Sequence, residues 1–165
     1  MRAFRRSSRP LLIALALVTL GASPGERAPT LDAPTLQGPR VSLAALRGRV
    51  VVVDFWASWC EPCRRALPRL HALARARERQ GLTVLTVSVD DERANCERFV
   101  REASVTLPVV HDASHRIATA WSPSAMPSTF VIDREGVVRA VIAGERPGAL
   151  EQAVSGLLRG EVAAR

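Results

Sequence analysis

The sequence predicts an α/β domain built around parallel β-strands, and three observations carry that prediction. The run at 50–56 is apolar except for one aspartate, which is typical of a strand buried on both faces. The segment from Glu61 to Gln80 has apolar residues at helical spacing, and Leu82 to Val89 is a second β-rich run. Strand, helix and strand in this order indicate a right-handed β-α-β unit.

The first 23 residues have the pattern of an export signal or an N-terminal anchor. Residues 11–20 are apolar except for Thr19, and four basic residues precede them: Arg2, Arg5, Arg6 and Arg9. A bilayer span needs about 20 apolar residues, so this shorter run favours a cleaved signal. Two candidate cleavage sites have small residues at the required positions, Thr19/Gly21 and Ser23/Gly25. Neither is an A-x-A, so a membrane tether through residues 11–22 stays open. We expect an exported protein, soluble or N-terminally anchored, in the periplasm or on the outer face of the cytoplasmic membrane.

Size and charge limit the function classes. About 142 residues follow the leader, enough for one domain with its own core but not for a second catalytic domain. The formal net charge of +7 includes the leader arginines, and the rest of the chain has no block of like charge. This pattern does not indicate a nucleic-acid partner. We expect a monomer that binds no nucleic acid.

The remaining elements follow in order along the chain. Residues 24–38 are rich in proline, glycine and alanine and predict an extended linker, so that the domain itself occupies 39–165. Further elements are expected as a helical turn at 42–46, helices at 91–103, 117–121 and 147–158, an irregular segment at 107–110, and a hairpin of strands 128–132 and 137–142.

The most informative motif is Cys60-Glu61-Pro62-Cys63, which stands where the first strand gives way to the helix. A helix N-terminus offers unpaired N–H groups and about half a positive charge, and both stabilise a thiolate. Cys60 is therefore the expected nucleophile, and Cys63, on the same face of the first turn, is the expected resolving cysteine. Pro62 suits a first helical turn. Glu61 places a carboxylate beside the pair and is expected to alter its reduction potential.

Two other interpretations of the cysteines stay open. A structural zinc site would combine Cys60 and Cys63 with His111 and His115, but 47 residues lie between Cys63 and His111, whereas zinc fingers have roughly 12 to 15 between the pairs. A purely structural disulfide is the second alternative. If Cys60 and Cys63 pair, Cys96 is left over, and its position on the apolar face of its helix predicts a buried, unreactive thiol.

Asp54 stands within the buried strand at 50–56. Burial opposes the charged form of a carboxyl group, so we expect its pKa to be raised, as in a buried general acid or base. An aspartate with only a structural role is the alternative.

Taken together, these motifs resemble the thioredoxin-fold proteins, and among them the exported TlpA/ResA-like thiol-disulfide oxidoreductases. Three stretches carry the resemblance: Val-Asp-Phe-Trp-Ala-Ser-Trp-Cys-Glu-Pro-Cys at 53–63, Met-Pro-Ser-Thr-Phe at 126–130 and Val-Ile-Asp-Arg-Glu-Gly at 131–136. The similarity extends from Ala33 to Leu158. It implies a thioredoxin-like fold, in which helices flank a central mixed β-sheet, with an N-terminal edge-strand extension.

The resemblance also implies roles for individual residues. Pro127 corresponds to a proline that follows a cis peptide bond and faces the disulfide, where the main chain of Met126 can pair with an extended substrate segment. A loop proline that stops an edge strand is the alternative. Trp59 is expected to pack over the site and shape its rim, with burial in the core as the alternative. Asp54 corresponds to an aspartate behind the second cysteine, which assists proton transfer at Cys63.

The implied function is that of an exported enzyme that reduces protein disulfides through Cys60 and Cys63, with neither cofactor nor metal. Relatives of this kind keep haem-attachment or metal-site cysteines reduced, and a membrane electron donor re-reduces them. We therefore expect a part in cytochrome c maturation or metal-site assembly. A disulfide-forming oxidant or a general thioredoxin is the alternative, ahead of a metal-binding carrier. A thiol peroxidase would need a Pro-x-x-x-Thr-x-x-Cys motif, which the sequence lacks.

Overall fold

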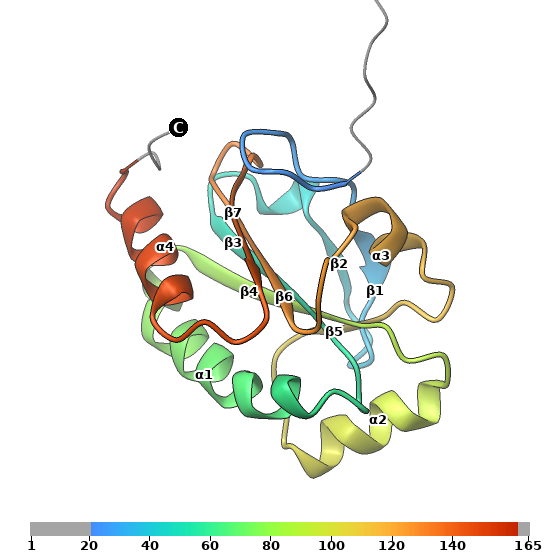
Figure 1. Ribbon diagram of the computed structural model, residues 1–165. Coiled ribbons are helices and arrows are strands. Elements are labelled where there is room, and N and C mark those ends of the chain that lie inside the picture. Colours follow the sequence, from blue (N-terminus) through green and yellow to red (C-terminus); the bar gives the residue numbers. More distant parts are fainter. Residues whose placement is uncertain (1–20, 162–165) are drawn as a thin grey trace, which may run out of the picture.

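A five-stranded mixed β-sheet forms the centre of the computed structural model, which describes residues 21–161 (Figure 1). The strands lie side by side in the order β5 (Val109–His111), β4 (Leu82–Ser88), β3 (Val50–Trp56), β6 (Ser128–Ile132) and β7 (Val138–Ala143). β4 is parallel to β3 and β5, whereas β6 is antiparallel to β3 and β7. The predicted central mixed sheet is confirmed.

Helices cover both faces of this sheet (Figure 1). The helices α1 (Glu61–Arg77), α2 (Arg93–Glu102) and α4 (Ala149–Leu158) lie on one face, and α3 (Arg116–Trp121) lies on the other. Alternate residues of β3 face each side, so Trp56 stacks at 4.7 Å on Phe99 of α2 while Phe55 lies 5.8 Å from Trp121 of α3. Every residue of β3 is consequently buried, as its unbroken valines predicted.

The observed helix ends differ from the predicted ones by a few residues. The α-helical part of α1 ends at Arg77, and a 3-10 turn, η2 (Glu78–Gln80), leads to Gly81. Gly81 has a φ of 95°, in the left-handed region that glycine adopts without strain, so it terminates the helix. α2 and α4 each begin two residues later than predicted.

The segment expected to be irregular at 107–110 is in part a strand. β5 (Val109–His111) pairs in parallel with β4, with Thr86 opposite Val109 and Ser88 opposite His111. A strand of three residues is too short to show an alternating pattern, so its pairing depends on the neighbouring strand.

The segment 24–38 is not an extended linker, because it packs on the domain. Leu31 is only 1% exposed, and Arg27 and Thr35 form isolated β-bridges with the rest of the chain. The strands β1 (Asp32–Pro34) and β2 (Arg40–Ser42) pair with each other as a separate hairpin, followed by the 3-10 turn η1 (Ala44–Leu46). The prediction of a linker from proline and glycine content was therefore wrong, because a few apolar side chains anchor this segment on the domain.

Of the predicted leader over 1–23, residues 1–20 lie outside the described part of the chain. Ala22 is buried, and its N–H donates to the carbonyl oxygen of Trp121 at 3.1 Å. Within residues 21–161, no helix has the length and apolar character needed to cross a membrane.

Candidate functional site: a disulfide at the start of α1

Cys60 and Cys63 form a disulfide at the N-terminus of α1. Cys60 is the N-cap residue, with the extended φ and ψ of −88° and 99°, and its Sγ accepts a 3.2 Å hydrogen bond from the N–H of Cys63. This bond uses one of the N–H groups that a helix leaves free at its start. Cys60 is 4% exposed and Cys63 is fully buried. Of the two cysteines, only Cys60 therefore keeps any exposed surface.

The two residues between the cysteines lie on the outer side of this first turn. Pro62 occupies a position where the helix needs no N–H from it. Glu61 is exposed, and its carboxylate lies 3.8 Å from Arg64 and 3.5 Å from Arg65. Arg65 also contacts Glu145, in the loop before α4, at 2.9 Å. Exposed ion pairs of this kind contribute little to stability.

Trp59 precedes Cys60 and projects into solvent. It is 70% exposed, which makes it the one exposed large hydrophobic side chain among the described residues. The turn that carries it is closed by the N–H of Cys60, which donates to the carbonyl oxygen of Ala57 at 3.1 Å. Burial of Trp59 in the core, the alternative interpretation, is wrong.

The peptide bond between Met126 and Pro127 is cis, as the resemblance implied. Met126 is half-buried and Pro127 is buried at the start of β6. The N–H of Gly144, at the end of β7, donates to the carbonyl oxygen of Pro127 at 2.8 Å. This hydrogen bond fixes the loop after β7 beside Pro127.

Asp54 lies in the middle of the buried strand β3 and is 1% exposed. Oγ1 of Thr129, directly opposite on β6, donates to Oδ1 of Asp54 at 2.6 Å. Oδ2 is buried and has no hydrogen-bond partner among the described residues. Burial raises the pKa of Asp54 from 3.8 to about 7, and the hydrogen bond from Thr129 opposes part of that rise. The predicted rise in its pKa is confirmed.

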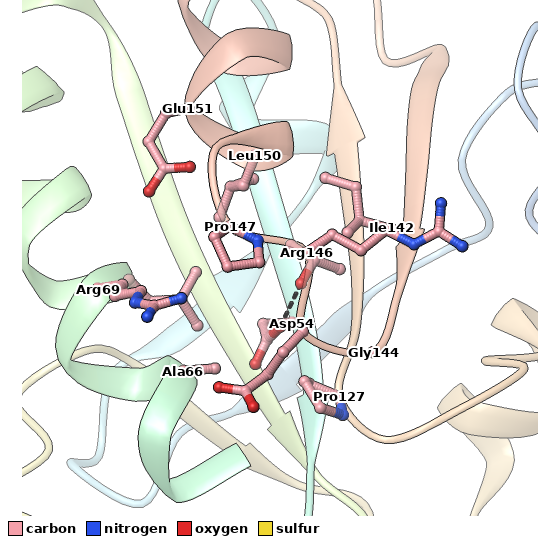
Figure 2. A pocket seen from close by; sticks show the side chains of 13 residues that line it. Asp54, Ala66, Arg69, Pro127, Ile142, Gly144, Arg146, Pro147, Leu150 and Glu151 are labelled. Atoms are coloured by element: carbon pink, nitrogen blue, oxygen red, sulfur yellow. Dashed lines mark hydrogen bonds between the residues drawn. The ribbon is translucent and has the colours of Figure 1, made fainter. Parts of the chain in front are cut away.

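A small cleft of about 50 Å³ adjoins this carboxyl group (Figure 2). We call it the Asp54 cleft, and its lining is Asp54, Ala66, Arg69, Leu70, Pro127, Thr129, Ile142, Gly144, Glu145, Arg146, Pro147, Leu150 and Glu151. Figure 2 shows Asp54 between α1 on one side and the loop before α4 on the other. Ala66 follows Cys63 by one helical turn. The structure thus brings Asp54, Pro127 and the helix that carries Cys63 to one cleft, while Trp59 and Met126 stand outside it.

Cys96 lies apart from this pair, on α2. It is fully buried and unpaired, and burial raises the pKa of its thiol to about 11. Its expected burial is confirmed.

The histidines in the two possible ligand positions have other neighbours. Nε2 of His111 lies 2.7 Å from the carbonyl oxygen of Asp90, and Nε2 of His115 lies 2.8 Å from Oδ1 of Asp91. Within residues 21–161 no three side chains of His, Cys, Asp or Glu form a group that could hold a metal ion.

Sequence reasoning did not find three residues next to the site. Thr129 belongs to the Met-Pro-Ser-Thr-Phe motif, but its partner on β3 depends on the pairing register. Ser58 and Asp90 are joined by hydrogen bonds although 32 residues separate them. Their only signal in the sequence is that each follows the carboxyl end of a neighbouring parallel strand, where side chains from different segments meet.

Comparisons with known proteins agree with this geometry. A family model described as the AhpC/TSA family matches residues 24–141. The chain is 33% identical over 120 residues to the thiol-disulfide oxidoreductase ResA of Geobacillus thermodenitrificans (strain NG80-2), an alignment that covers 73% of this chain and 69% of that protein. It is 32% identical over 122 residues to ResA of Bacillus subtilis (strain 168), covering 74% and 68%.

A solved structure with the same fold supports the same relationship. It is the crystal structure of a Chlorobium tepidum protein assigned as the thiol:disulfide interchange protein DsbE. The TM-score is 0.79 at 31% sequence identity, and the alignment covers 84% of this chain and 99% of that one.

Proposed function

Since this chain belongs to the AhpC/TSA family and is a thiol-disulfide oxidoreductase of the ResA/DsbE type, we propose that it is an exported reductase of protein disulfides whose nucleophile is Cys60. The observation that carries the proposal is the position of Cys60 as N-cap of α1, with its sulfur on the N–H of Cys63. In the reduced protein this N–H and the positive end of the helix dipole stabilise a thiolate on Cys60.

The reaction is a pair of thiol-disulfide exchanges. The Cys60 thiolate attacks one sulfur of the partner's disulfide, so that a mixed disulfide forms and the partner's other sulfur leaves as a thiolate. Cys63 then loses its proton and attacks Sγ of Cys60, which releases the partner's second sulfur. The partner gains two electrons and two protons, and Cys60 and Cys63 become the disulfide seen here.

We assign to Asp54 the role of accepting the proton that Cys63 loses. Its pKa of about 7 leaves the carboxyl group able both to accept and to return a proton near neutral pH. The Asp54 cleft, which also includes Ala66 one turn after Cys63, supports an exchange of that proton with solvent.

Substrate recognition is assigned to Trp59, to Met126 and to the buried Pro127 that follows it. The exposed indole of Trp59 offers apolar area to a partner. The main chain of Met126, before the cis bond, offers hydrogen-bonding groups to an extended segment. Because main-chain pairing does not depend on the partner's side chains, this arrangement suits unfolded or extended cysteine-containing segments.

Glu61 and Pro62 are assigned to the tuning of the reduction potential. For a two-electron couple about 30 mV corresponds to roughly 1.4 kcal/mol, so modest changes beside the sulfurs alter the preferred direction.

We further propose a membrane electron donor for re-reduction, a monomeric state, and a role in cytochrome c maturation or metal-site assembly. The apolar run at 11–22 supports export, with or without a tether.

Trapping of the mixed disulfide tests the mechanism. Cys63→Ser removes the resolving thiol, so it should accumulate partners bound through Cys60, whereas Cys60→Ser should accumulate none. Both variants are compared in a Cys96→Ser background, so that the third thiol cannot contribute. Partners captured equally by Cys60→Ser would contradict the assignment of Cys60.

The reduction potential tests the direction. Equilibration of the Cys60–Cys63 couple with glutathione or dithiothreitol should give a value near that of thioredoxin, about −270 mV, and not near the about −120 mV of a strong oxidant such as DsbA. A value near about −120 mV would mean that the protein forms disulfides instead of reducing them, and it would leave the proposed exchange chemistry intact.

A further inference from the structure

A buried carboxylate that plays no part in the proposed mechanism lies close to the active-site turn. Asp90 follows β4 and is 2% exposed. Its carboxylate accepts hydrogen bonds from the N–H of Ser58, at 3.1 Å to each oxygen, and from Oγ of Ser58 at 2.6 Å. Oγ of Ser88 donates to it at 2.7 Å. Ser58 therefore supplies two of the three donors to the carboxylate of Asp90, and it stands two positions before Cys60.

The main chain around Asp90 is fixed independently of Ser58. The N–H of Asp90 donates to Oγ of Ser88 at 3.2 Å. The carbonyl oxygen of Asp90, which can only accept, lies 2.7 Å from Nε2 of His111 on β5, so this ring nitrogen carries a proton and donates. Asp90 is thus held by two neighbouring strands and presents a fixed acceptor to Ser58.

The hydrogen bonds between Asp90 and Ser58 lie just beyond the end of the β3–β4 ladder, and this position indicates their role. The parallel pairing of β3 with β4 ends at Trp56 and Ser88, with one further bond from the N–H of Val89 to the carbonyl oxygen of Trp56 at 2.9 Å. Asp90 and Ser58 continue the connection past the end of the ladder, into the turn that delivers Cys60 to the N-cap of α1.

We propose that Asp90 is a positioning residue of the disulfide site, which acts through Ser58 to hold the turn 57–60 in the conformation that places Sγ of Cys60 on the N–H of Cys63. Hydrogen bonds to a charged acceptor are about twice as strong as neutral ones, and two of them on a single residue leave its main chain little freedom. The inference rests on the proposed role of Cys60 as nucleophile.

The reactivity of Cys60 tests the proposal. In the reduced protein, the rate of alkylation of Cys60 by iodoacetamide at neutral pH is measured by peptide mapping for wild type, Ser58→Ala and Ser58→Thr. Ser58→Ala removes one hydrogen bond and leaves the charge of Asp90 in place, so a slower reaction reports the position of Cys60 alone. We expect a loss on the order of tenfold, because a weaker contact of Sγ with the N–H of Cys63 leaves less of Cys60 as the reactive thiolate. Ser58→Thr keeps the hydroxyl and should retain most of the wild-type rate.

Hydrogen–deuterium exchange tests the role of Asp90 itself. Asp90→Asn should accelerate exchange at the amides of Ser58 and Cys60 and leave the β6–β7 turn unchanged. Asp133→Asn is the matched control: Asp133 is also a buried aspartate that holds a turn, through the N–H groups of Glu135 and Val137. It should accelerate exchange in its own turn only.

The outcomes separate this inference from the proposed function. If wild-type Cys60 is alkylated no faster than Cys63, the assignment of the nucleophile fails. If wild-type Cys60 reacts fast and Ser58→Ala reacts equally fast, Asp90 has only a structural role and the inference is overturned. Should Asp90→Asn fail to fold, the alkylation rates of the two Ser58 variants still decide.

Discussion

Thr129 and Asp54 face each other across the antiparallel pair of β3 and β6, and Oγ1 of Thr129 donates to Oδ1 of Asp54 at 2.6 Å. The second carboxyl oxygen, Oδ2, is buried without a partner among the described residues. A carboxyl group with one satisfied oxygen in a buried strand is stable when protonated and costly when charged. The free energy of unfolding should therefore depend on pH in the range where Asp54, the proposed proton acceptor, titrates.

The first prediction concerns stability against pH. The pKa of Asp54 is about 7 in the folded protein and 3.8 for the free group. Between these pH values its carboxyl group is protonated in the folded protein and ionised in the unfolded one. The free energy of unfolding should therefore fall as the pH rises from about 4 to about 7, by on the order of 4 kcal/mol, and level off above. Asp54→Asn should lack this fall and be more stable than wild type above pH 7. Urea unfolding of the oxidised proteins across this range measures the difference, and parallel profiles would contradict it.

A second prediction isolates the hydrogen bond from Thr129. Thr129→Val keeps the shape of the side chain and removes its donor, so the pKa of Asp54 should rise further, because this bond now lowers it. The pH at which stability levels off should shift to a higher value than in wild type. The same urea series detects this shift. A matched substitution on β6, Val131→Thr, should leave that pH unchanged, and a shift there as well would point to a general effect of the strand.

The third prediction concerns the exchange reaction. Asp54→Asn removes the proposed proton acceptor of Cys63, so release of a substrate from the mixed disulfide should slow by about 100-fold, the usual contribution of a positioned general base. The attack by Cys60 should keep its wild-type rate. Rapid-mixing kinetics with a fluorescent disulfide substrate separate the two steps. Equal slowing of both steps would instead indicate that the site has lost its geometry.

The fourth prediction separates binding from stability at Trp59. Because this side chain is 70% exposed, Trp59→Ala should change the free energy of unfolding by no more than about 0.5 kcal/mol. KM for a protein disulfide should rise several-fold, while the rate with a small disulfide such as oxidised glutathione should stay near that of wild type. An unchanged KM for the protein substrate would remove Trp59 from the binding surface.

The last prediction concerns Cys96. Burial and a thiol pKa of about 11 should keep it unreactive toward iodoacetamide at pH 8 in the folded, reduced protein, under conditions that modify Cys60. Mass spectrometry before and after addition of urea measures this, with modification of Cys96 expected only after unfolding. Cys96→Ser should leave the reduction potential of the Cys60–Cys63 couple at its wild-type value.

The sequence predicted the features that depend on short stretches of chain. A run of valines from Val50 indicated a strand with both faces buried, and helical periodicity after Glu61 placed the two cysteines at a helix N-terminus. This local arrangement also makes Cys60 the residue at the start of the helix. The resemblance to thioredoxin-fold proteins added Pro127, whose isomer no local pattern indicates.

The sequence failed where a few residues depend on distant ones. The strand β5 has only three residues, and pairing with β4 defines it. The segment 24–38 has the composition of a linker, yet Leu31 anchors it in the core. Neither feature has a periodic pattern long enough to detect.

By itself, then, the chain determined which residues form the strand, the helix and the cysteine pair between them, because burial and helical periodicity act over neighbouring residues. Only the folded protein decided which donors reach the carboxyl groups of Asp54 and Asp90. Thr129 lies 75 residues from Asp54 and Ser58 lies 32 from Asp90, so each contact exists through strand register alone. That register brings Thr129 to Asp54, where its hydrogen bond opposes part of the rise that burial causes, and the resulting pKa of about 7 is one that the strand's composition could give only as a direction.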